Sequence, residues 1–389
     1  MLDPRAPVDR FILLYALAWA GGTIGYVPLL SILLPVQVAG LAGKTTGVDW
    51  LAYIALIGAI AASLAGILFG FLSDITHNRR GWIAAGLALS CTLLLVIGRM
   101  TSLPGIVAAI VAWQLGLNMM LGPLAAWAGD LVPDDRKGLL GGLMAFAPGL
   151  GALSGALVTI PGLADGQARL GLVALLVAVC VLPVVLNNAP PLLERPQAPS
   201  EQHRARGLAL RMWLARLAVQ VAEATLFAYL FFWLLSLDPT VSDNQTARLF
   251  SLIMLVSVPL ALLVGRWSDR TDRPIAPLQI CALVSALGLL GMALAPGVTG
   301  AMLAYGLFGV SSAVFLALHS AQTLRILPRP DRRGRDLGLF NLANTVPSLV
   351  MPWLTIAIVP VAGYPALFGL LALLAASAGL LLQKVSPAR

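Results

Sequence analysis

Three side chains that could exchange a proton share one face of a single apolar segment. Arg216, Gln220 and Glu223 occupy positions i, i+4 and i+7 of the run 209–236, so a helix places them along one face. Arg216 and Glu223 are then two turns apart, about 10 Å along the axis. A charge inside a bilayer costs about 2.5–3.5 kcal/mol on insertion scales, so it usually faces a cavity or a partner. The face is either a proton-coupling site or a structural polar pair between helices.

Other apolar runs also carry polar and aromatic side chains along one face. Aromatic rings beside amide and hydroxyl groups are typical of a pocket for a small amphipathic or hydroxylated ligand, and also of packing between helices. The candidates that join Gln220 and Glu223 in a predicted substrate site are Tyr15, Trp19, Tyr26, Gln114, Asn118, Ser312, Phe315, Asn341 and Asn344. His319 lies near the end of its run, where a gate is as plausible as a binding site.

A short sequence motif, called the phrase below, occurs twice, and the two copies are separated by about half the length of the chain. The pattern Gly-x-x-Ser-Asp-x-Thr occurs at 70–76 and again at 265–271. Each copy follows one long apolar run and precedes another. A chain that repeats itself at half its length is typical of two similar halves, so the two copies are expected at equivalent positions.

Each copy of the phrase places a carboxylate close to arginines. A carboxylate at a helix end can form charge-assisted hydrogen bonds with arginines of the next helix. Contacts of this kind must break when the helix ends separate, so they would bias one conformation. The alternative is that the arginines only orient the chain in a membrane. The candidate pairs are Asp74 with Arg79 or Arg80, and Asp269 with Arg270 or Arg273.

Composition places these residues in a membrane protein. Hydrophobic residues make up 59% of the chain, charged residues 11%, and the mean hydropathy is +0.90, whereas a soluble domain has roughly 25% charged residues. A membrane-spanning helix needs about 20 mostly apolar residues, and backbone groups in lipid must be satisfied within the segment, which favours helices. The predicted spans are 11–38, 51–70, 82–98, 103–128, 139–160, 168–187, 209–236, 247–265, 276–294, 299–324, 337–360 and 364–383.

The basic residues are distributed unevenly between the two sides of the predicted membrane. With the N-terminus inside, twenty of the 25 Lys and Arg residues fall on the side of the termini. This asymmetry is the positive-inside pattern. It predicts that both termini are cytoplasmic, and it accounts for the net charge of +8 without a nucleic-acid partner. The exceptions are Lys44, Arg99, Arg169 and Arg248 on the opposite side, and Arg216 within a run.

The spans fall into two sets of six. The sequence predicts an N-terminal bundle over 1–187, a proline-rich cytoplasmic linker over 188–208 and a C-terminal bundle over 209–389. The three histidines and three cysteines are scattered among different segments, and no Gly-x-x-x-x-Gly-Lys-Ser/Thr motif occurs. An enzyme would need a convergent cluster of reactive groups. We therefore expect neither an enzyme nor a bound metal or cofactor.

Three cytoplasmic motifs resemble those of the major facilitator superfamily. They are Gly70-x-x-x-Asp74 followed by Arg79-Arg80, then Gly265-x-x-x-Asp269-Arg270-x-x-Arg273, and Asp130-x-x-Pro133-x-x-Arg136. The resemblance covers the plan of the whole chain and implies twelve transmembrane helices in two pseudo-symmetric six-helix bundles. It also implies a cytoplasmic gate at these residues. The basic residue that usually follows the first loop aspartate is Ile75 here, a departure from the pattern.

The resemblance implies a function for the chain as well as a fold. Members of the superfamily are secondary active transporters that move a small solute by alternating access, so we expect a small organic substrate, a coupling proton and a monomer in the inner cell membrane. Glu223 and Arg216 are the candidates for proton coupling. A drug-type exporter and a sugar-like importer both remain open, and a transporter-like sensor that binds without flux is the alternative class.

Overall fold

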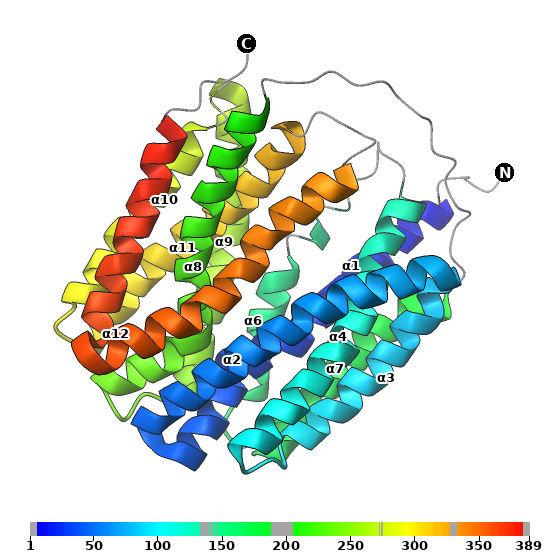
Figure 1. Ribbon diagram of the computed structural model, residues 1–389, viewed down its shortest axis with the longest axis horizontal. Helices are drawn as coiled ribbons and strands as arrows, with labels where there is room; N and C mark the ends of the chain where they lie inside the picture. Colours follow the sequence, from blue (N-terminus) through cyan, green and yellow to red (C-terminus); the bar gives the residue numbers. More distant parts are fainter. Residues whose placement is uncertain are drawn as a thin grey trace. The chain divides into compact units, whose positions relative to one another are not determined.

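The computed structural model is built of helices, and every regular element among the residues that it describes is helical (Figure 1). This confirms the all-α expectation. It describes residues 6–132, 140, 143–144, 146–187, 205–271, 273, 275–326 and 333–383. The elements in chain order are α1 (Ala6–Pro28), the π-helix η1 (Leu29–Leu33), α2 (Leu34–Thr76), α3 (Arg79–Ile97), α4 (Leu103–Leu131), α6 (Ala147–Val158), α7 (Gln167–Leu186), α8 (Ala205–Leu237), α9 (Asp243–Thr271), α10 (Ala276–Leu294), α11 (Val298–Ile326) and α12 (Arg333–Gln383).

The chain divides into two compact units. The first comprises Met1–Arg195 together with Ser242–Ser251, and the second comprises Pro196–Val241 together with Leu252–Arg389. Helix α9 therefore begins in the first unit and continues in the second. The predicted bundles would have placed the whole of α9 in the second half. Most of the predicted linker, 188–208, lies outside the described residues.

Helices of membrane-spanning length account for most of the described chain. Ten of the described helices or helix parts are long and apolar enough to cross a membrane, and α6 is a shorter apolar helix. The predicted spans 337–360 and 364–383 lie within the single element α12, which changes direction at Gly363. The last part of the predicted span 11–38 passes through η1 into α2.

Glycine allows the two sharp changes of direction inside long elements. Gly43 in α2 has φ 74° and ψ −177°, and Gly363 in α12 has φ 74° and ψ 177°. This region of backbone conformation is open almost only to glycine. Helical hydrogen bonding resumes directly after each glycine, so α2 and α12 each join two helical segments in one element.

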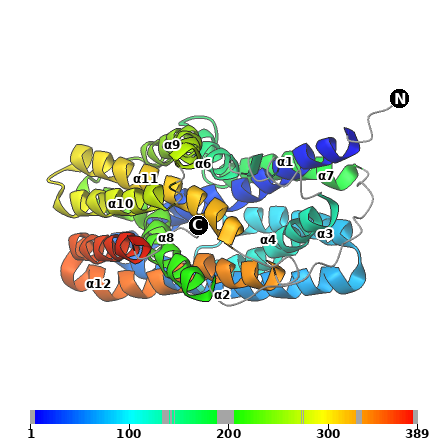
Figure 2. The same ribbon diagram turned by 90° about the horizontal axis from the view of Figure 1, so that it is seen from above.

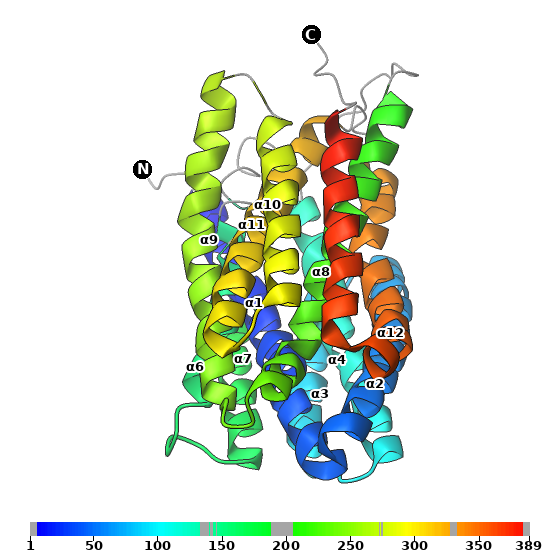
Figure 3. The same ribbon diagram turned by 90° about the vertical axis from the view of Figure 1, so that its left-hand side faces the viewer.

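One close helix crossing holds a pair of neighbouring helices in each unit. In the first unit α3 packs on α4 (Figure 2), where a Cβ added to Gly86 would lie 2.4 Å from the Met120 backbone nitrogen. In the second unit α10 packs on α11 (Figure 3), where a Cβ added to Gly288 would lie 2.6 Å from the Phe308 nitrogen. Because lipid provides no hydrophobic drive for helices to associate, close backbone packing of this kind is a main source of their affinity.

Further small residues mark the other crossings of the first unit. A Cβ on Gly21 would lie 2.7 Å from a Val181 methyl of α7, and one on Gly151 would lie 3.0 Å from the Thr23 carbonyl oxygen of α1. The Thr23 hydroxyl donates to the Ala147 carbonyl of α6 at 2.7 Å. Gly21 and Gly151 therefore lie where helices meet.

We expect Gly86→Ala and Gly288→Ala to destabilise the folded protein by about 1–3 kcal/mol each, because the new methyl group would overlap backbone atoms that cannot rotate away. Thermal unfolding of the detergent-solubilised protein measures the effect. Gly40→Ala in α2 and Gly306→Ala in α11 are matched controls, since a Cβ at either position meets no atom within 4 Å. Equal shifts in test and control variants would show that these crossings are not close-packed.

Candidate functional site

A left-handed residue and a capped helix start place Arg79 at the end of α2. Helix α2 ends at Thr76, and His77 adopts φ 52° and ψ 23°, which turns the chain away from the helix axis. The Asn78 side chain then accepts a hydrogen bond from the Gly81 backbone N–H at 2.9 Å, a typical N-terminal cap. Arg79 becomes the first residue of α3, next to the carboxyl end of α2.

Arg79 joins three helices through charged contacts. Its Nη1 lies 2.6 Å from Asp74 Oδ1 and donates to Ser73 Oγ at 2.7 Å, both on α2. Its Nε and Nη2 each lie 3.0 Å from Asp130 Oδ2 on α4. The side chains of Arg79 and Asp130 are only 16% and 19% exposed, whereas that of Asp74 is 60% exposed. Solvent screens the Asp74 pair more strongly, so Asp130 is the stronger partner.

The other residues predicted for the cytoplasmic gate do not join the contacts of Arg79 that are given above. Arg80 is exposed. Arg136 and the side chain of Asp269 lie outside the described residues. In the second copy of the phrase, Ser268 Oγ donates to the Arg273 carbonyl at 3.3 Å, and the Arg273 N–H donates to the Ser268 carbonyl at 3.2 Å. Arg270 is exposed. The equivalent serines thus have unlike roles, and the sequence analysis did not identify Ser73 as a partner of Arg79.

His319 connects α11 to α8 inside the second unit. It is fully buried, and its Nε2 lies 2.8 Å from the Met212 carbonyl oxygen of α8. A carbonyl can only accept, so Nε2 carries the proton and Nδ1 is left as an acceptor. Arg216 Nη1 lies 3.4 Å from that Nδ1 and 3.5 Å from the Leu316 carbonyl. The arginine of the predicted proton-coupling face therefore donates toward α11.

Glu223 is held by a neighbour on its own helix. Gln220 Nε2 donates to Glu223 Oε2 at 2.8 Å. The other amide atom, Gln220 Oε1, is buried and has no hydrogen-bond partner among the described residues. An unsatisfied buried acceptor costs about 1–3 kcal/mol. This pair would consequently gain from a ligand donor or a change of protonation.

The other candidate residues form local pairs within each unit. Tyr15 is 1% exposed and its ring stacks on Trp19, with centroids 6.3 Å apart. Asn118 Nδ2 donates to the Gln114 backbone carbonyl at 2.9 Å. In the second unit, Ser312 donates to the Gly309 carbonyl of its own helix, and the buried Phe315 ring lies 5.6 Å from His319. Tyr26 is partly buried, and the side chains of Asn341 and Asn344 lie outside the described residues.

Comparisons with known proteins agree with this architecture. The family model described as Major Facilitator Superfamily matches residues 212–389. An uncharacterized MFS-type transporter of Mycobacterium tuberculosis is 27% identical over 277 residues, which make up 66% of this chain and 61% of the relative. The match thus spans less than two thirds of that relative's length.

Solved structures share the fold over almost the whole chain. A D-xylose-proton symporter has a TM-score of 0.73 at 14% identity, with 97% of this chain and 98% of that chain covered. A POT family transporter in complex with 5-aminolevulinic acid has a TM-score of 0.74 at 15% identity, with 98% and 96% covered. At such low identity the likeness concerns the fold alone.

We expect Asp130→Asn to destabilise the protein by about 1–3 kcal/mol, because it removes the charge from a largely buried partner of Arg79. Asp74→Asn should cost less than about 1 kcal/mol, since that pair is exposed. Arg80→Gln, which alters an exposed arginine next to Arg79, is the control and should have no effect. The measurement is the melting temperature at low and high salt. A larger loss for Asp74→Asn than for Asp130→Asn would contradict this ranking of the two pairs.

Proposed function

We propose that this chain, a member of the major facilitator superfamily, is a secondary active transporter that moves a small organic solute by alternating access and couples the movement to protons. The main support is the charged face of α8, since Arg216 and Glu223 lie inside an apolar helix where a charge is costly unless it has a role. The positive-inside pattern supports a location in the inner cell membrane with cytoplasmic termini.

The proposed coupling site is the Gln220–Glu223 pair. An ionised carboxylate only accepts hydrogen bonds, whereas a protonated one also donates. With Glu223 ionised, the Gln220 amide donates to it and Gln220 Oε1 has no partner among the described residues. With Glu223 protonated, a rotated Gln220 amide could accept from the carboxyl group through that same oxygen. Protonation would therefore exchange one hydrogen-bond arrangement for another, which is the property that a coupling site needs.

Several titratable groups surround this pair. Arg216 lies on the same helix, about two turns away. Helices α11 and α12 pack against α8. Among their described side chains the titratable ones are Tyr305 and His319 on α11 and Tyr364 on α12. With Arg216 as the nearby cation, ionised Glu223 leaves the face electrically neutral, and protonated Glu223 leaves it positive. A proton moving down 100 mV supplies about 2.3 kcal/mol, enough for roughly fifty-fold accumulation at one-to-one coupling.

The gate that we propose is the cytoplasmic cluster around Arg79. Its charge-assisted contacts hold the ends of α2, α3 and α4 together, and their loss would favour a different arrangement of those ends. The proposed gate also includes the other residues that the sequence analysis named as gate candidates, namely Arg80, Arg136, Asp269, Arg270, Arg273 and His319.

The substrate would be recognised by the polar and aromatic residues of the substrate site predicted in the sequence analysis, which include Tyr15, Gln114, Ser312 and Asn341. Two solved structures of like fold are a D-xylose-proton symporter and a transporter bound to 5-aminolevulinic acid. These support small polar solutes as the first class to screen, with amphipathic cations as the test of an exporter.

We expect Glu223→Gln to abolish accumulation of substrate driven by a pH gradient, because the amide cannot exchange a proton, while substrate-for-substrate exchange continues. The measurement is uptake of radiolabelled sugars, amino acids and amphipathic cations into proteoliposomes, with and without the gradient. Glu223→Asp keeps the carboxyl group and should retain part of the driven uptake. Gradient-driven accumulation by Glu223→Gln at the wild-type level would exclude coupling at this residue, and no flux of any solute would argue for a sensor.

A further inference from the structure

Two amide side chains of α4 form a hydrogen-bonded pair whose orientation is determined by its own contacts. Asn118 Nδ2 donates to the Gln114 backbone carbonyl at 2.9 Å and to Gln114 Oε1 at 3.4 Å. A backbone carbonyl only accepts, so the first bond identifies the nitrogen of the Asn118 amide, and the second identifies the oxygen of the Gln114 amide. The atoms of the pair that remain outside these bonds are Asn118 Oδ1 and Gln114 Nε2.

These two atoms have no hydrogen-bond partner among the residues that the structure describes. Gln114 is only 8% exposed, and Asn118 is partly buried. The two residues are one helical turn apart on the same face of α4. Asn118 Oδ1 is an acceptor and Gln114 Nε2 is a donor. A single group that both donates and accepts a hydrogen bond would therefore satisfy both atoms.

Glycines of α2 leave space beside both atoms. Helix α2 packs on α4, and a Cβ added to Gly66 would lie 3.5 Å from Asn118 Oδ1, with no other atom within 4 Å outside the adjoining backbone. A Cβ added to Gly58 would lie 3.9 Å from Gln114 Nε2. These are ordinary contact distances, so a side chain at either position would cover the amide atom that it meets. Gly66 is itself partly exposed, which keeps this crossing open.

The helices around the amide pair carry no charge at this depth. Helices α1, α2 and α3 each pack on α4. The predicted spans 11–38, 51–70, 82–98 and 103–128 contain no Asp, Glu, Lys or Arg. A charged ligand group would have no counter-ion on these spans, and burial of an unpaired charge is costly. A hydroxyl or a primary carboxamide has both a donor and an acceptor and needs no counter-ion.

We propose that Asn118 Oδ1 and Gln114 Nε2 form a substrate subsite for one uncharged group that both donates and accepts a hydrogen bond, namely a hydroxyl or a primary carboxamide. The ligand group donates to Asn118 and accepts from Gln114, while Gly66 leaves the Asn118 oxygen uncovered. The proposal rests on the proposed function, because it assigns a chemical class to the solute that the chain would move. The subsite selects polyols and neutral amides over organic ions.

Two substitutions on different helices test the subsite. Gln114→Met keeps a side chain of similar length and removes the donor, and Gly66→Ala places a methyl group against Asn118 Oδ1. Each should weaken the binding of a neutral probe about tenfold, because each removes one hydrogen bond between neutral groups. The measurement is equilibrium binding of radiolabelled D-xylose, myo-inositol and nicotinamide to the detergent-solubilised protein. Gly171→Ala in α7 is the matched control, since its Cβ would lie 3.6 Å from a Leu95 methyl instead of a polar atom, and it should leave binding unchanged.

A comparison of probes on the unaltered protein does not depend on the folding of any variant. N,N-dimethylnicotinamide keeps the carbonyl of nicotinamide but cannot donate, so it should bind about tenfold more weakly. Benzoate and tetraphenylphosphonium carry a charge, and any binding of these ions should be the same in Gln114→Met and Gly66→Ala as in the wild type. The melting temperatures of both variants serve as the check that they are folded.

The possible results separate the subsite from the transport function. Absence of binding by all three neutral probes, or equal binding of nicotinamide and its dimethyl analogue, would overturn the subsite. Unchanged affinity in both Gln114→Met and Gly66→Ala would also overturn it, because the two amide atoms would then face only water or lipid. Weaker binding in these variants without flux of any probe into proteoliposomes would count against the transport function while the subsite stands. Gradient-driven flux of a probe that both variants bind normally would remove the subsite and keep the transporter.

Discussion

The absence of water in a bilayer core is the constraint on which this structure depends. A backbone or side-chain polar group there must find its partner within the protein, and the ends of helices are where partners are lacking. The carboxyl end of α3 shows the solution. Gln37 of α2 donates to the carbonyls of Ile97 and Met100 at 3.0 and 2.9 Å, and Gln167 of α7 donates to that of Leu95. Two glutamine side chains thus supply hydrogen-bond donors to the carbonyls at the carboxyl end of α3.

The same constraint separates structural polar groups from those with a candidate role. Among the described residues, many hydroxyl groups within the spans bond a carbonyl three or four residues earlier, as Ser31 does to Val27 and Thr225 does to Val221. Such groups are satisfied in any arrangement of the helices. Arg216 and His319 differ, because each has partners on the other of the two helices α8 and α11. They are the groups whose energy depends on how α8 and α11 lie, and hence the ones through which a ligand or proton could act.

The sequence predicted the elements better than the contacts between them. Apolar runs gave the spans, and helical spacing correctly grouped Gln220 with Glu223, because both features depend on a single helix. The partner of Asp130 on α3, the carbonyl that His319 binds and the pairing of Arg169 with Asp243 depend on how helices are rotated and where they cross. Gly86 illustrates the limit. It forms a close crossing and has a small residue, Ser90, four positions later, but a small-residue pair does not by itself show which neighbouring helix it meets.

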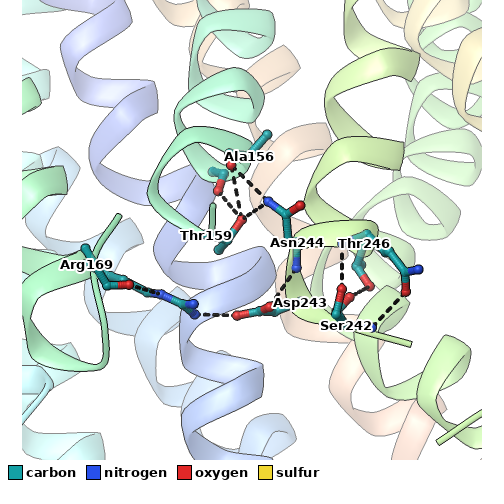
Figure 4. Close-up of polar contacts among 10 residues, drawn as sticks. Ala156, Thr159, Arg169, Ser242, Asp243, Asn244 and Thr246 are labelled. Atoms are coloured by element: carbon teal, nitrogen blue, oxygen red, sulfur yellow. Dashed lines mark hydrogen bonds and ion pairs between the residues drawn. The ribbon is translucent and has the colours of Figure 1, made fainter. Parts of the chain in front are cut away.

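The polar contacts between α9 and α6 and those of Arg79 differ in whether their groups have other hydrogen-bond partners within their own helices. Where α9 contacts α6, Ser251 Oγ lies 2.7 Å from the Ala152 carbonyl and Asn244 Nδ2 donates to Thr159 Oγ1 (Figure 4), and the hydroxyls of Ser251 and Thr159 also bond carbonyls within their own helices. At the start of α3, Arg79 holds two carboxylates and a hydroxyl, and no carbonyl of its own helix can replace an ion pair with Asp130. The contacts of Arg79 therefore have no replacement within its own helix, whereas the hydroxyls of Ser251 and Thr159 do.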